Sequence, residues 1–141
     1  MLTYETAHSR YLYKLIMNLQ PRLENKALLI RPLKESDFES LYDVAKDPKI
    51  WEQHPRKRNV RTEFEQFFSE SIKSKGALVI IDKKTDTIIG SSRYKIFDEF
   101  PNILEIGWTF LDRTYWGGEY NGMVKNLMTQ YAFDFVTEIH L

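Results

Sequence analysis

Glu105-Ile-Gly-Trp-Thr-Phe-Leu-Asp-Arg-Thr-Tyr-Trp-Gly-Gly-Glu-Tyr-Asn-Gly122 is the most informative stretch of this chain. Its first part alternates as a strand does, a turn with two adjacent glycines follows, and a helix capped by Asn121 runs toward Val136. A strand that ends in such a turn directs several backbone N–H groups at one point, at the positive end of a helix. The stretch therefore predicts an anion site that suits a pyrophosphate.

The composition is that of one packed globular domain. The chain has 141 residues, of which 43% are hydrophobic and 14% aromatic, enough for a buried core. Its 20 lysines and arginines balance its 20 aspartates and glutamates, whereas a nucleic-acid-binding protein usually carries a basic excess. No apolar run approaches the ~20 residues that span a membrane, and the N-terminus lacks the pattern of a secretory signal. We therefore expect a cytoplasmic protein that binds neither nucleic acid nor a membrane.

Two parts are expected, an N-terminal extension at residues 1–22 and a domain at residues 23–141. The extension has four apolar residues at helical spacing, which predicts a short helix: Leu12, Leu15, Ile16 and Leu19. The elements expected in the domain are a strand at 28–32, helices at 37–45 and 62–73, strands at 77–82, 88–97 and 104–111, a helix from 121, and a strand at 139–141. Capping boxes at residues 36–39 and 62–65 begin the first two helices.

Four segments resemble one known family, the GNAT acetyltransferases. Leu28-Leu-Ile-Arg-Pro-Leu-Lys-Glu-Ser-Asp-Phe38 is similar to the opening of the subgroup that contains ribosomal-protein N-terminal acetyltransferases. Asp47-Pro-Lys-Ile-Trp-Glu-Gln-His-Pro55 resembles the loop between the first two helices of that subgroup. Ile88-Ile-Gly-Ser-Ser-Arg-Tyr94 and Glu105-Ile-Gly-Trp108 resemble its third and fourth strands. The resemblance implies an α/β fold with a mostly antiparallel sheet flanked by helices.

The chain departs from the family pattern in two ways. The family turn reads Arg or Gln, two residues, Gly, one residue, then Gly or Ala, and the matching stretch here is Trp116-Gly-Gly-Glu-Tyr-Asn121. Glu119 replaces the central glycine and Asn121 the final small residue. Family members also continue with a full fifth strand, an Asn-bearing loop, a fourth helix and two more strands. We therefore expect a C-terminally truncated GNAT domain.

The resemblance implies acetyl-coenzyme A (acetyl-CoA) as co-substrate, and no metal. The pantetheine arm would pair like an extra strand with the backbone at Phe110 and Leu111. The pyrophosphate would lie on the turn and on the first residues of the last helix. The residues expected to bind the cofactor in that segment are Trp116, Gly117, Gly118, Tyr120, Asn121 and Gly122.

Acetyl transfer needs a base and an acceptor pocket. By resemblance, Glu105 is the candidate base, acting directly or through a water; the alternative is an ion pair across the sheet with Arg93. Trp51, His54 and Trp108 are candidate acceptor-binding residues. Their alternative roles are ordinary ones, a structural or surface group for the histidine and core packing for the tryptophans. Because the chain has no cysteine, a cysteine acyl-enzyme is excluded and the amine attacks directly.

These expectations lead to one main function and one alternative. The main function is transfer of acetyl from acetyl-CoA to a primary amine, which is a protein N-terminus or a small molecule. The alternative is a non-catalytic remnant that binds coenzyme A weakly or self-associates through an open edge of its sheet. The missing C-terminal elements favour low activity and burial of that edge in an assembly.

Overall fold

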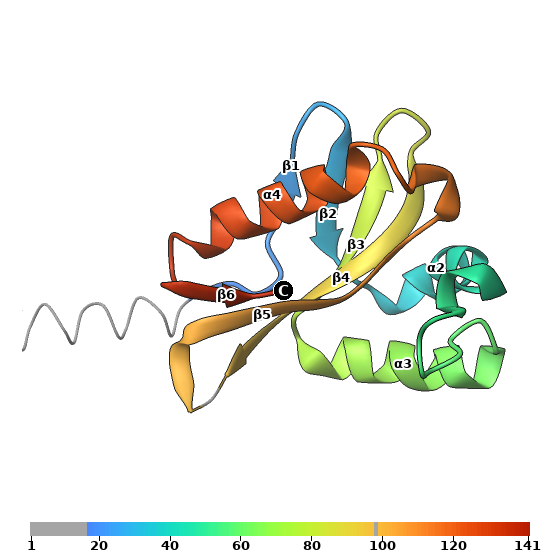
Figure 1. Cartoon of the computed structure of the whole chain (residues 1–141), viewed down its shortest axis with the longest axis horizontal. Helices are drawn as coiled ribbons and strands as arrows, with labels where there is room; N and C mark the ends of the chain where they lie inside the picture. The colour runs from blue at the N-terminus through green and yellow to red at the C-terminus, as the bar shows by residue number, and fades with distance from the viewer. Residues whose placement is uncertain (1–16, 98) are drawn as a thin grey trace, which may run out of the picture.

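The chain folds as a six-stranded sheet with helices on both faces. The structure is a computed structural model, and it describes residues 17–97 and 99–141. The elements are β1 (Leu23–Glu24), β2 (Leu28–Pro32), α2 (Phe38–Ala45), α3 (Arg61–Ser74), β3 (Ala77–Asp82), β4 (Thr87–Phe97), β5 (Phe100–Leu111), α4 (Tyr120–Ala132) and β6 (Glu138–His140). Apart from β1, which was not expected, the order of helices and strands agrees with the expected one, and the α/β, mostly antiparallel architecture is confirmed (Figure 1).

The strands lie in the sheet in the same order as in the sequence, β1 to β6. Neighbouring strands are antiparallel except β5 and β6, which are parallel. β6 pairs only with residues 103–105 of β5. Among the described residues, the outer edge of β5 from residue 106 to residue 111 therefore has no neighbouring strand, and its backbone groups can pair with something else.

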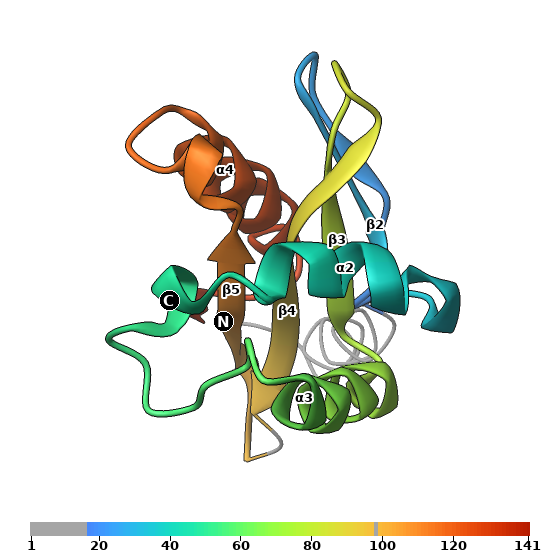
Figure 2. The same cartoon turned by 90° about the vertical axis from the view of Figure 1, so that its right-hand side faces the viewer.

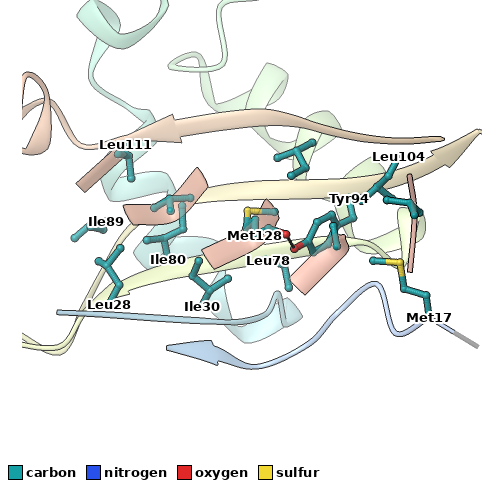
Figure 3. Close-up of a cluster of buried hydrophobic side chains, with 14 residues drawn as sticks. Met17, Leu28, Ile30, Leu78, Ile80, Ile89, Tyr94, Leu104, Leu111 and Met128 are labelled. Atoms are coloured by element: carbon teal, nitrogen blue, oxygen red, sulfur yellow. Dashed lines mark hydrogen bonds between the residues drawn. The ribbon is translucent and has the colours of Figure 1, made fainter. Parts of the chain in front are cut away.

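Two hydrophobic clusters hold the layers together. α4 covers one face of the sheet, and α2 and α3 cover the other (Figures 1 and 2). β3 lies between them and is buried along its whole length, which explains why its first five residues are all apolar. On the α4 side, the Tyr94 hydroxyl donates a hydrogen bond of 2.6 Å to the carbonyl oxygen of Met128 (Figure 3). Burial raises the pKa of Tyr94, so this hydroxyl stays protonated and serves the packing.

The two expected capping boxes do not form. Asp37, rather than Ser36, is the N-cap of α2, and it makes no side-chain bond to the helix end. Its carboxylate instead accepts two hydrogen bonds of 2.9 Å from Arg31 of β2, which fixes the start of the helix against the sheet. α3 begins at Arg61, one residue earlier than expected, so Thr62 lies inside the first turn and cannot act as its cap.

Part of the expected N-terminal extension packs on the domain. Met17 is only 7% exposed and lies in the α4-side cluster. The carbonyl oxygen of Asn18 accepts a hydrogen bond from Tyr131 on α4, and Gln20 donates to the Ala77 carbonyl oxygen at 2.9 Å. Residues 17–20 are not helical, so the predicted helix does not reach Leu19. The other residues of that prediction, including Leu12, lie outside the described residues. No helix within the described part of the chain is long and apolar enough to cross a membrane.

Candidate functional site

A cavity of about 460 Å³ opens at the unpaired edge of β5, and we call it the β5-edge cavity. The last residues of β5 and the turn that follows it into α4 form one side, and residues 50–54, which are distant in the sequence, form the other. Its lining residues are Ile50, Trp51, His54, Thr109, Phe110, Leu111, Trp116, Gly117, Asn121 and Lys125. No acidic residue is among them.

A β-bulge in β5 shapes the wall on the sheet side. Arg93 of β4 pairs with Gly107, but Ser91, two residues earlier, pairs with Phe110, so β5 has one extra residue. Trp108 takes up this residue with a φ of +55°, a region that tryptophan rarely adopts. A bulge re-aims the side chains around it. Beyond it, Phe110 packs in the cluster beneath α3, and the two strands realign before the turn.

The turn between β5 and α4 contains the two adjacent glycines and ends at Glu119, the residue before α4. The Trp116 indole N–H donates a hydrogen bond of 2.9 Å to the Leu111 carbonyl oxygen. Gly117 has a φ of +74°, which glycine adopts without strain. The prediction that Asn121 caps the helix is wrong, because α4 begins at Tyr120 with Glu119 as its N-cap. Asn121 therefore lies in the first turn of α4, where it lines the cavity.

Residues 50–54 form the opposite wall, and contacts on both sides hold them. The Asp47 side chain accepts from the Lys49 N–H at 3.1 Å and begins the 3-10 helix Pro48–Trp51. The same carboxylate pairs with Arg113, which follows β5, so an ion pair joins the two walls. The hydrogen bond from Arg113 lowers the pKa of Asp47. The loop and the turn are thus connected directly.

Trp51 and His54 both line the cavity. Trp51 is only 3% exposed; its indole N–H donates to the Ala45 carbonyl oxygen at 2.7 Å, and its ring centre lies 5.1 Å from that of Phe110. It is therefore a core residue and a lining residue at once. The His54 Nδ1 lies 2.9 Å from the backbone nitrogen of Arg56 and 3.0 Å from its oxygen. Nδ1 is thus engaged in either tautomer, and Nε2 is the nitrogen left for a ligand.

The candidate base Glu105 and the candidate acceptor-binding residue Trp108 do not line the β5-edge cavity. Trp108 is half-buried beneath Arg93, whose guanidinium lies 4.3 Å from the ring centre. Arg93 donates to the Ser71 hydroxyl at 2.6 Å, and burial lowers the pKa of Arg93. Its contacts within the described residues include no ion pair with Glu105, so the proposed cross-strand pair is absent. A Cβ added at Gly107 would lie 3.5 Å from the Glu105 Oε1, so this carboxylate points along the strand toward the bulge.

Three lining residues were not expected from the sequence: Ile50, Thr109 and Lys125. Lys125 follows Asn121 by four residues, so the helical repeat indicates that both lie on one face. Three expected cofactor residues, Gly118, Tyr120 and Gly122, lie outside the lining. The Tyr120 ring packs at 4.7 Å on that of Tyr115. Within the described part of the chain, no group of three His, Cys, Asp or Glu side chains is arranged to hold a metal ion.

The comparisons with known proteins agree with this geometry. A model of the acetyltransferase (GNAT) domain matches residues 27–140. A GCN5-related N-acetyltransferase from Brucella melitensis has a similar structure, with a TM-score of 0.70 and 18% identity over 83% of this chain. This chain spans 56% of that protein. No significant match to a curated protein sequence was found.

Two further similar structures are of acetyltransferases with stated substrates. One is the ribosomal-protein-S5-alanine acetyltransferase from Vibrio fischeri, with a TM-score of 0.59 and 18% identity over 81% of this chain and 68% of that one. The other is the spermidine N-acetyltransferase from Vibrio cholerae in complex with CoA and spermine, with a TM-score of 0.60 and 16% identity over 78% of this chain and 66% of that one. At these identities the structural likeness shows the fold alone, and the family model decides membership. This chain belongs to the GNAT acetyltransferase family.

Proposed function

We propose that this chain binds acetyl-CoA in the β5-edge cavity and transfers the acetyl group to a primary amine by direct attack. The observation that carries the proposal is the meeting of three segments around one cavity: the free edge of β5, the glycine turn before α4, and the loop at residues 50–54. The edge of β5 suits the pantetheine arm, the turn suits the pyrophosphate, and the loop suits the acceptor amine. The family membership supports the same chemistry.

The cofactor's two parts have different requirements. The pantetheine arm carries amides, which pair with unpaired backbone groups as an added strand does. The free edge of β5 at residues 106–111 offers such groups next to the cavity. The pyrophosphate needs N–H donors and positive potential, which the turn at Gly117 and the N-terminus of α4 supply.

The transfer itself needs a proton acceptor near the attacking amine. Glu105 is the carboxylate that we propose for this role, either directly or through a water, because it points along β5 toward the bulge. The amine nitrogen attacks the thioester carbonyl carbon, the C–S bond breaks, and coenzyme A leaves as the thiolate. Glu105 takes the proton that the amine releases. Trp51 and His54 then form the wall that the acceptor approaches.

A valine in the glycine turn tests the phosphate site. Gly117→Val places a β-branched residue at a φ of +74°, so the turn must change its conformation. We expect the affinity for coenzyme A to fall about tenfold or more. Gly118→Val is the matched control, since its φ is not positive and an added Cβ meets no atom within 4 Å. Equal affinity of both variants and the wild type in calorimetry would remove the phosphate site from the turn.

An acetylation assay tests the proposed reaction. The acceptor panel contains an alanine-terminated peptide and spermidine, because the similar Vibrio enzymes are named for those two kinds of amine. Mass spectrometry should detect an acetylated product that depends on the chain and on acetyl-CoA. Binding of coenzyme A without transfer to any amine would instead favour the second candidate, a non-catalytic domain that self-associates. The free edge of β5 is the observation behind that candidate, and light scattering measures its assembly.

A further inference from the structure

Lys125 is a charged group in the β5-edge cavity for which the described part of the chain supplies no charged partner. Its ammonium donates one hydrogen bond, of 3.1 Å, to the hydroxyl of Thr109. That hydroxyl is itself 2.8 Å from the hydroxyl of Ser92. An ammonium carries three donors, and the acceptor that it meets here is neutral. Among the described residues, no carboxylate forms an ion pair with it.

The surroundings of Lys125 make this arrangement costly without a ligand. Its side chain is half-buried, and burial lowers the pKa of the ammonium. Burying a charge without a counter-charge disfavours the charged form. The cavity lining contains no aspartate or glutamate, and the carboxylate of Asp47 nearby in the fold is already paired with Arg113. An anion that enters the cavity would supply the counter-charge that the ammonium of Lys125 lacks.

We propose that Lys125 binds an oxyanion of the ligand in the β5-edge cavity. The proposal rests on the cofactor and acceptor assigned above, and it adds their recognition chemistry. Two sources carry this chemistry, a phosphate of coenzyme A and a carboxylate on the acceptor amine. Lys125 lies one helical turn beyond Asn121, on the same face of α4, and it reaches across to β5 beside the bulge. Its ammonium therefore lies in the cavity where α4 meets β5.

The phosphate source is tested with coenzyme A and pantetheine, which share the arm and differ in the phosphates. Calorimetry on the full chain compares the wild type with Lys125→Met, which keeps the length of the side chain and removes the charge. We expect the variant to lose about tenfold or more in affinity for coenzyme A. Its affinity for pantetheine should stay unchanged. Lys125→Arg should retain most of the binding, because it keeps a cation at the same place.

The acceptor source is tested with alanine and alaninamide, which differ in the carboxylate. Amide chemical shifts report their binding to the chain in the presence of coenzyme A. If the carboxylate is the partner, the wild type should prefer alanine, and Lys125→Met should lose that preference. Lys73→Met, at an exposed lysine of α3, controls for the change in net charge.

The outcomes separate this inference from the proposed function. A wild type that binds coenzyme A, with Lys125→Met equal to it for all four ligands, overturns the inference and leaves the cofactor site standing. A wild type that binds none of the four ligands overturns both. A lower melting temperature of Lys125→Met with unchanged affinities means that the lysine serves the packing of α4, which also contradicts the inference.

Discussion

Glu105→Gln is expected to lower the rate of acetyl transfer roughly 10²- to 10⁴-fold, the range that removal of a general base produces. Glutamine keeps the shape of the side chain and cannot accept the proton. The affinity for acetyl-CoA should change little, because Glu105 lies outside the cavity lining. Steady-state kinetics separates these two quantities, since loss of a base lowers kcat and kcat/KM together.

Glu119→Gln is the matched control for this experiment. Glu119 is exposed at the N-cap of α4 and does not line the cavity, so its removal should leave the turnover unchanged. A Glu105→Gln chain that loses melting temperature in proportion to its activity would assign Glu105 to the stability of the sheet. Unchanged turnover of Glu105→Gln with a normal melting temperature would exclude Glu105 as the base.

Gly90→Ala is expected to destabilise the fold by about 3 kcal/mol or more, as overpacking against backbone does. A Cβ at this position of β4 would lie 2.1 Å from the Phe110 carbonyl oxygen and 2.9 Å from the Leu111 Cδ2. The two strands would have to separate at the end that forms the cavity wall. Thermal unfolding should show a midpoint lower by roughly 10 °C for a domain of this size.

Gly107→Ala on the neighbouring strand is the control. It replaces a strand glycine with alanine where the added Cβ has room, so it reports the effect of losing a glycine without overpacking. An added Cβ there meets its nearest atom, the Glu105 Oε1, at 3.5 Å, which is an ordinary contact distance. Its midpoint should therefore stay close to that of the wild type. Equal midpoints for Gly90→Ala and the wild type would mean that β4 and β5 are not in contact as described.

Much of the fold follows from local sequence patterns. The bounds of β3, Ala77–Asp82, agree with the prediction, because the apolar run at 77–81 follows Gly76 and is too short for a helix. The bounds of α3 differ by one residue at each end from the predicted helix. β5 begins at Phe100 rather than at residue 104, since its pairing with β4 extends through a segment that contains a proline. Such pairing is a tertiary contact and leaves no local pattern.

The site was predictable in its parts and less so in its assembly. The glycine turn and the loop with Trp51 were each identified from the sequence. The ion pair that joins them was not, because its two residues, Asp47 and Arg113, lie 66 positions apart in the chain. The bulge at Trp108 has no sequence signal, because a tryptophan at positive φ is determined by the strands around it. Lys125 was overlooked because a helical lysine usually faces solvent. Its spacing of four from Asn121 was the available indication.

A titration of the isotopically labelled chain with acetyl-CoA shows whether the cofactor binds in the β5-edge cavity. The backbone amide signals of Phe110, Leu111, Gly117 and Asn121 should shift together with one dissociation constant. At a hundred times that constant, the ligand should stabilise the fold by about 2.7 kcal/mol. Unchanged amide signals at millimolar acetyl-CoA, or shifts confined to residues outside the cavity, would contradict binding there.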